Sequence, residues 1–264
     1  MRRMTWLGAA LLTGAMGWPG AASAAVMPFS DNFDADTVGA TTIPNFTAGG
    51  AAIYSIAEQS PGDNALQAIS NTNSGSEGVS LTNASGNAIT LSTDARLVNL
   101  VTGASGAAAN FGFGLFGNSA NFSAGTEYRL LLGTIGNVGT LFIVRNGTNA
   151  TTGVVSGAPV TIANGTDYTL TATVTPTTVG GNAALAFHAT ATDGTHTTVY
   201  DYTDASPLTG TFFGYRTATA ATGTSETVQY DNFSATLAPE PGSLALIALA
   251  AGALLPNRRR RRRA

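Results

Sequence analysis

The chain has 264 residues, no cysteine, no lysine and a formal net charge of −3. Eight of its twelve arginines lie at the two ends, so the region between them has four arginines against fourteen acidic residues, a net charge of −10. So acidic a surface repels phosphate groups, which argues against nucleic acid or anionic lipid as a partner. The lack of cysteine excludes disulfides and thiolate metal sites.

The N-terminus has the pattern of a secretory signal peptide. Two arginines precede an apolar stretch over residues 4–16, and small residues follow at 21–25. A positive start, a short apolar core and a small-residue A-x-A site are the features that signal peptidase recognises. We expect cleavage after Ala24, with the next alanine as second choice and an uncleaved membrane anchor as the alternative. Residues 1–24 are therefore assigned to the signal peptide.

Residues 25–237 show the period-two alternation of antiparallel strands. In the segment 167–176 apolar residues alternate with threonines, which gives one apolar face and one hydroxyl-bearing face. Asp193-Gly194 predicts a two-residue hairpin turn with Thr192 opposite Thr195. Further strands are expected at 51–56, 64–69, 88–91, 95–101, 111–116, 128–135, 140–145, 159–162, 211–216 and 227–237.

Short strands separated by Gly, Asn or Asp turns over this length predict an all-β fold, a two-sheet antiparallel β-sandwich in one domain over 25–237. A β-helix solenoid is the rival fold for a chain so rich in Gly, Asn and Thr. A solenoid requires a fixed short repeat, and the sequence contains none.

The order of the segments resembles the concanavalin A-like (laminin-G-like) jelly roll. The resemblance is carried by the segments Phe29–Phe33, Asp167–Leu170, Asp193–Gly194, Phe212–Tyr215 and Tyr230–Phe233. It implies that the first and last strands lie side by side. The Asp-Asn-Phe sequences near the two ends of the domain would then meet, although they are 200 residues apart.

No catalytic pattern is found. Glycan-cleaving jelly rolls that this chain resembles place carboxylates at alternating positions of one strand, and no such run exists here. Asp201 and Asp204 are three residues apart and would point to opposite faces. His188 and His196 fall on opposite faces in the predicted hairpin register, so they form no relay. The sequence therefore predicts a protein that is not an enzyme and has no catalytic cofactor.

One metal site is suggested by the pairing of the terminal strands. It would gather the oxygen atoms of Asp31, Asp231 and Asn232, and jelly rolls resembling this one sometimes hold a structural calcium ion between those strands. The alternative interpretation is that these residues only form turns and flank strands.

Carbohydrate is the second ligand hypothesis. Lectin-like sites stack aromatic rings on sugar faces and use Asn and Asp to bind hydroxyl groups. The sequence offers four candidate rings, Tyr54, Phe116, Phe122 and Tyr215, and does not place a site.

The C-terminal residues 238–264 carry three features in order: Pro239-Glu240-Pro241, an apolar run over 244–255 and six arginines over 258–263. This order closely resembles the PEP-CTERM sorting signal of exported proteins. An apolar run over 244–255 would form roughly 18 Å of helix, short of a bilayer core of about 30 Å. The resemblance implies recognition by a membrane-embedded exosortase, transient anchoring through this run and cytoplasmic arginines. A basic nucleic-acid tail is the alternative, but it requires no apolar run. The sorting residues are Pro239, Glu240 and Pro241, and the stop-transfer block is Arg258, Arg259, Arg260, Arg261, Arg262 and Arg263.

Together these features predict an exported protein of the cell surface or extracellular matrix with a structural or adhesive role. Its processing partners would be signal peptidase and an exosortase-type enzyme. One alternative is a lectin-like module that binds extracellular polysaccharide, and a second is a glycan hydrolase with an unrecognised site.

Overall fold

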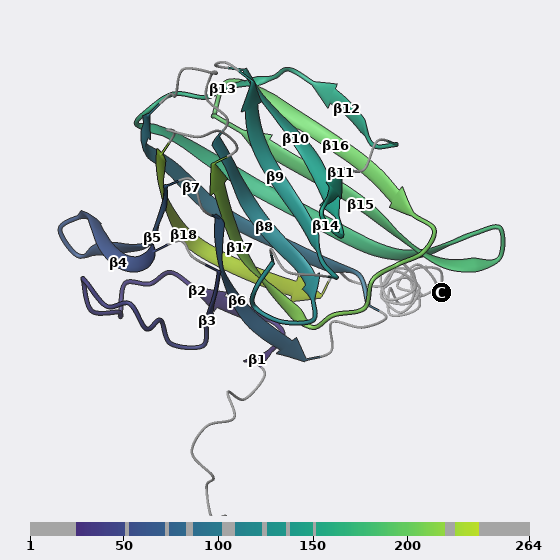
Figure 1. Ribbon diagram of the computed structural model, residues 1–264, viewed down its shortest axis with the longest axis horizontal. Helices are drawn as coiled ribbons and strands as arrows, with labels where there is room; N and C mark the ends of the chain where they lie inside the picture. Colours follow the sequence, from purple (N-terminus) through teal and green to yellow (C-terminus); the bar gives the residue numbers. More distant parts are fainter. Residues whose placement is uncertain are drawn as a thin grey trace, which may run out of the picture.

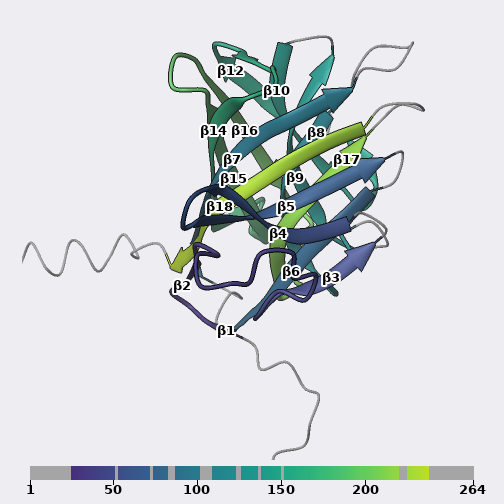
Figure 2. The same cartoon turned by 90° about the vertical axis from the view of Figure 1, so that its left-hand side faces the viewer.

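The structure is a computed structural model and describes residues 25–50, 53–71, 74–82, 87–101, 109–122, 126–135, 138–149, 152–219 and 225–237. Over these residues the chain is all-β, with two sheets packed face to face (Figures 1 and 2). The predicted β-sandwich is confirmed. Both predicted terminal signals lie outside the described ranges. Within them, no helix is long and apolar enough to span a membrane.

Each sheet contains nine strands, and all neighbouring strands except β1 and β6 are antiparallel. The first sheet has the order β1-β6-β17-β8-β9-β10-β11, with β3 paired to β6 and β13 paired to β10. The second has the order β12-β16-β15-β14-β7-β18-β5-β4, with β2 paired to β18.

The strands of the first sheet are β1 (Ala25–Val26), β3 (Thr47–Gly50), β6 (Ser74–Thr82), β8 (Ala109–Gly117), β9 (Tyr128–Ile135), β10 (Val138–Arg145), β11 (Thr148–Asn149), β13 (Val160–Thr161) and β17 (Phe212–Thr219). Those of the second sheet are β2 (Phe29–Asp31), β4 (Ile53–Ser60), β5 (Asp63–Asn71), β7 (Ile89–Val101), β12 (Val154–Gly157), β14 (Thr166–Val179), β15 (Asn182–Thr192), β16 (Thr197–Asp204) and β18 (Ser225–Leu237).

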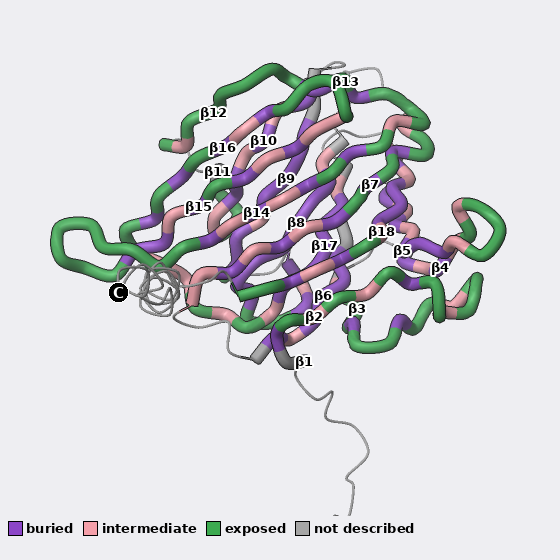
Figure 3. The backbone as a smooth tube through the Cα atoms, turned by 180° about the vertical axis from the view of Figure 1, so that it is seen from behind, coloured by how far each residue is buried: buried purple, intermediate pink, exposed green. Residues whose placement is uncertain are grey.

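The core lies between the two sheets and follows from the alternation in sequence. Along β14, Tyr168, Leu170, Ala172 and Val174 are buried, whereas the threonines between them face outward. The same alternation of buried and exposed residues runs along β7 and β16, as Figure 3 shows. Burying one face of each strand supplies the main driving force for this arrangement.

The first and last strands of the domain pair as the sequence predicts. Asp31 lies opposite Phe233 where β2 pairs with β18. Behind this pairing, Phe33, Phe233 and Tyr215 join an aromatic cluster in which the rings of Tyr215 and Phe233 are 5.2 Å apart. The two Asp-Asn-Phe sequences therefore meet at one place.

Two local predictions are wrong. Thr192 pairs with Thr197, not with Thr195, because the Asp193 carboxylate accepts the backbone N–H groups of Thr195 and His196 and stabilises a four-residue loop. The two-residue shift leaves every side chain of β16 on its predicted face. The expected strands 88–91 and 95–101 are one continuous strand, β7, because polar residues at its centre face outward while their neighbours remain buried.

The sequence did not predict the two-residue strands β1 and β11 or three longer strands, β3, β6 and β12. The three longer strands explain why. They are rich in Gly and Ser, which disfavour strands by local propensity. Tertiary contacts override that preference in β6, where the Ser76 hydroxyl lies 2.6 Å from the carbonyl oxygen of Ala120 in the β8–β9 connection.

Candidate functional site

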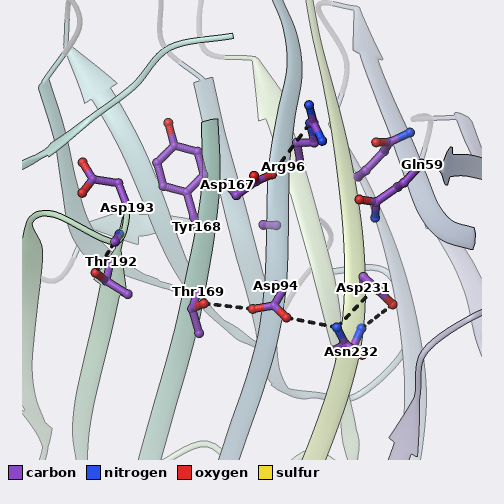
Figure 4. Close-up of a pocket in the computed structure, with 13 residues that line it drawn as sticks. Gln59, Asp94, Arg96, Asp167, Tyr168, Thr169, Thr192, Asp193, Asp231 and Asn232 are labelled. Atoms are coloured by element: carbon purple, nitrogen blue, oxygen red, sulfur yellow. Dashed lines mark hydrogen bonds and ion pairs between the residues drawn. The ribbon is translucent and has the colours of Figure 1, made fainter. Parts of the chain in front are cut away.

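A polar groove of about 440 Å³ crosses the outward face of the second sheet (Figure 4). It runs over β18, β7 and β14 to the turn between β15 and β16. The pairing of the strands decides which side chains form the floor of the groove. Outward-facing residues that are paired across neighbouring strands lie in rows perpendicular to the strands.

The first row consists of Asp231, Asp94 and Thr169, which are consecutive cross-strand partners. The Thr169 hydroxyl donates to one oxygen of Asp94 at 2.9 Å, and the Asn232 amide donates to the other at 3.0 Å. The same amide nitrogen lies 3.2 Å from Asp231 Oδ2. Figure 4 shows this chain of hydrogen bonds, which holds two carboxylates close together on an accessible surface.

Asn232 reaches both carboxylates because β18 carries an irregularity there. The register with β7 shifts between Asp231 and Ser234, and Asn232 has φ of 52°. Asn adopts this left-handed conformation more easily than most residues, and a bulge of this kind redirects neighbouring side chains. As a result Asp231 faces the groove while Phe233 faces the core.

The second row lies one step along the strands and contains Gln229, Arg96 and Asp167. Arg96 Nε is 3.7 Å from Asp167 Oδ1, and both side chains are substantially exposed. Gln229 extends the row toward β5 through Gln67, at 3.5 Å between Nε2 and Oε1. Arg96 is the one cationic side chain among the residues that line the groove.

Partial burial and neighbouring carboxylates raise the pKa of Asp231 to about 6. Desolvation contributes most, and Asp63, Asp34 and Asp94 add repulsion, while the Asn232 N–H acts in the opposite direction. Near neutral pH this groove therefore presents mainly hydrogen-bond acceptors, with donors from Asn232, Arg96 and the glutamines.

The three residues of the predicted calcium site come to the same part of the molecule. Asn232 lines the groove and also a second hollow of about 760 Å³ that contains Asp31, whereas Asp231 lines only the first. Burial raises the pKa of Asp31, and its carboxylate accepts the Phe33 N–H at 2.9 Å. Among the described residues, no three His, Asp or Glu side chains are grouped so that they could hold a metal ion. Calcium binding stays a prediction.

The four aromatic candidates for sugar stacking are all buried, so the prediction that these rings stack on sugars is wrong. Tyr54 and Phe116 are about 5 % exposed, and Phe122 and Tyr215 are fully buried. Phe122 lies flat on the outer face of the first sheet, where a Cβ on Gly114 would come within 2.2 Å of its ring. Tyr215 stacks on Tyr230 inside the sandwich, with the ring centroids 4.3 Å apart.

The histidines do not lie in the groove. His188 Nδ1 is 2.7 Å from Asp201 Oδ1 on the exposed face of β15 and β16, and His196 lies in the hairpin loop beside Asp193. Asp204 points into the protein and binds the Tyr128 hydroxyl at 2.5 Å, on the opposite face from Asp201 as expected.

Sequence reasoning missed Asp94, Arg96, Gln229 and Asp167 as site residues. Each lies at an outward position of its strand, and nothing in the sequence distinguishes it from other exposed polar residues. Only the pairing of β18, β7 and β14 brings them into rows. The processing residues Ala24, Pro239–Pro241 and Arg258–Arg263 fall outside the part of the chain that the structure describes.

No protein-family model matches this sequence, and no curated protein matches it. Among solved structures, the cellulose-induced protein Cip1 is similar over 79 % of this chain and 96 % of its own, with 14 % identity and a TM-score of 0.49. The carbohydrate recognition domain of Emp47p is similar over 80 % and 95 %, with 13 % identity and a TM-score of 0.46. Lectin II from Ulex europaeus is similar over 79 % and 99 %, with 14 % identity and a TM-score of 0.46. All three TM-scores are below 0.5.

Proposed function

We propose that this chain is an exported, non-catalytic β-sandwich protein that binds polysaccharide through the groove on its second sheet. The observation that carries the proposal is the pair of outward rows, in which carboxylate, amide, guanidinium and hydroxyl groups from neighbouring strands face one hollow. Sugar hydroxyl groups both donate and accept hydrogen bonds, so a surface with both kinds of partner at fixed spacing suits them.

The charge of the groove selects among glycans. The single cation Arg96 is outnumbered by the four aspartates that line the groove, Asp94, Asp167, Asp193 and Asp231. Uronic acids and sulfated sugars would meet repulsion, whereas neutral sugars and amino sugars would not. Since all four predicted stacking rings are buried, binding relies on hydrogen bonds, and we expect modest affinity for one site that increases along a repetitive polymer.

Export and surface delivery belong to the same proposal and are supported by the two terminal signals. The signal peptide directs the domain across the inner membrane, and the Pro239–Pro241 signature marks the tail for removal by an exosortase-type enzyme. Mass spectrometry of the mature protein tests this step. An N-terminus at Ala25 and a C-terminus before Leu244 are expected, and an intact arginine block at the C-terminus would contradict it.

A second candidate function is favoured by one feature of the groove. Asp94 and Asp231 both contact the amide nitrogen of Asn232, and the pKa of Asp231 is raised to about 6. Retaining glycosidases use two carboxyl groups about 5–5.5 Å apart, one of them protonated. Release of reducing sugar from a bound polysaccharide, abolished in Asp231→Asn, would favour this function over binding alone.

A glycan array probed with the mature protein tests the main proposal. Binding to neutral or amino-sugar polymers is expected, and it should be lost in Asp94→Ala and in Asn232→Ala, which remove the acceptor and the donor of the same hydrogen bond. Thr171→Ala changes the same sheet face outside the groove and serves as the matched control. Equal binding by all four proteins, or no binding by the parent, would refute the groove as a glycan site.

A further inference from the structure

The edge of the hydrophobic core borders an apolar hollow at one end of the sandwich. The hairpin formed by β14 and β15 extends past the first sheet (Figure 1), and residues 175–183 of this hairpin are exposed, as Figure 3 shows. Beneath it lies a groove of about 170 Å³, to which Pro176, Leu185, Leu208 and Phe116 contribute. Leu185 and Phe116 belong to the core, and Leu208 packs against it.

This end groove, defined by the four residues just named, differs in chemistry from the polar groove. None of the residues that line it is charged, and its surface is almost entirely apolar. A hollow of this size accommodates one or two branched aliphatic side chains, and exposed apolar surface of this kind is favourable to cover. The partner that fits is therefore a short, uncharged, aliphatic segment.

The last described strand leaves the sandwich toward this groove. Leu237, the final residue of β18, lies opposite Ile89, which in turn pairs with Val174 of β14. Because β18 and β14 both run antiparallel to β7, they run in the same direction. The groove residues on β14, which follow Val174, thus lie ahead of the chain as it leaves β18. Leu237 is itself 39 % exposed at this end.

The chain beyond Leu237 has the length and composition to fill the groove. The two strand spacings from β18 to β14 amount to roughly 10 Å, and the groove begins about two residues farther along β14. Six residues, 238–243, can span roughly 20 Å when extended. The segment that follows, 244–255, has no charged residue and contains leucine at 244, 246 and 249.

We propose that the end groove is a docking site for the apolar segment 244–255 of the same chain while that segment is in water. The segment would place one or two aliphatic side chains beneath the β14–β15 hairpin and so cover the apolar surface of the end groove. Such docking would shield the tail before it enters the membrane or is removed. The proposal is independent of glycan binding, since the polar groove lies on the opposite side of the same sheet, away from the core.

Because the chain has no cysteine, introduced pairs give a clean test in the full chain. Thr209→Cys lines the groove and is exposed, and it is combined with Leu246→Cys in the tail. We expect a disulfide within one chain that forms about tenfold faster than in the control pair Thr195→Cys with Leu246→Cys, because docking raises the local concentration of the two thiols. Thr195 lies in the β15–β16 loop at the other end of β15.

A charge in the tail tests the apolar contact without altering the folded domain. Ile247→Asp should bring the rate for the Thr209→Cys pair down to that of the control pair, whereas Ser243→Asp, outside the apolar run, should leave the rate nearly unchanged. Equal rates for the two cysteine pairs would overturn the proposal. So would a disulfide between two chains, which would identify a second copy as the occupant, or a rate insensitive to Ile247→Asp.

Discussion

Acidic residues inside the sandwich and acidic residues on its outer face have raised pKa values for different reasons. Glu226 is fully buried between the sheets, where desolvation raises its pKa well above the ordinary value. Glu77, also buried, has a pKa raised to about 7 by desolvation. Asp231 is half-buried in a groove, and three nearby carboxylates add to the effect. A raised pKa therefore indicates a ligand site only where the carboxyl group also faces accessible space.

The first prediction compares two losses of stability, one from truncating a side chain in the core and one from truncating a side chain on the outer face of the sheet. Tyr215→Ala removes a fully buried ring that packs against Tyr230 and Phe233. It should lower the free energy of unfolding by about 3–5 kcal/mol, whereas Thr171→Ala on the outer face should change it by less than about 0.5 kcal/mol. Urea denaturation followed by circular dichroism measures both. A loss for Tyr215→Ala no larger than that for Thr171→Ala would show that the core is not where we place it.

The second prediction concerns the interior carboxyl group of Glu77. Its folded-state pKa lies above the unfolded value of 4.5, so the folded state holds its proton more tightly. Stability from this group is fully present below pH 4.5, declines as the pH rises to about 7 and is then constant. Glu77→Gln should raise stability by about 2 kcal/mol at pH 8 and should flatten the decline between pH 4.5 and 7. Chemical denaturation of the parent and Glu77→Gln from pH 4.5 to 8 measures this difference. The same dependence of stability on pH in both proteins would contradict the burial of this group.

The third prediction applies the same reasoning to the outer face. The pKa of Asp231 is raised from 3.8 to about 6, so its contribution to stability declines between those pH values. Solvent screens this group, and Asp231→Asn should gain only about 1 kcal/mol at pH 7.5. Unlike Glu77→Gln, it should also weaken glycan binding, because the variant replaces an acceptor oxygen by a donor. Calorimetric titration with the best polysaccharide from the array, beside a melting curve, separates the two effects. A variant that gains stability and binds normally would leave Asp231 without a role in the site.

The fourth prediction is the smallest effect on stability. Arg96→Ala breaks the exposed contact with Asp167, and such surface ion pairs contribute about 0–1 kcal/mol, less as salt increases. The melting temperature should therefore hardly move, while affinity for neutral glycans decreases because the groove loses its guanidinium donor. Differential scanning fluorimetry measures the melting temperature, and the same calorimetric titration measures the affinity. A marked loss of stability with unchanged affinity would mean that Arg96 supports the sheet and not the site.

Most of the β-strands could be predicted because their local pattern and their tertiary environment agree. The segment 167–176 alternates strictly, and β14 buries the face that the alternation predicts. The prediction failed where the two disagreed. β6 has the sequence SGSEGVSLT, whose local propensity favours a loop, yet β17 and β3 pair with it on both sides.

The candidate site was the least predictable part. Asn232 was singled out as an oxygen ligand for calcium between the terminal strands, and the structure places it between Asp94 and Asp231. The sequence does not mark Asp94 as a site residue, because exposed aspartates are common in strands. It becomes part of a site because β7 separates β18 from β14, an order set by contacts between residues more than 60 positions apart.

The sequence by itself determined the all-β class and the inward and outward faces of the main strands, because both depend on short-range periodicity, while the terminal export signals stay a prediction. Only the tertiary structure decided which strands are neighbours, which rings are buried and where the polar rows and the end groove lie. The physical reason is that a strand leaves its backbone hydrogen bonds and one of its faces to be satisfied by other strands. The choice of those partners depends on packing across the whole domain.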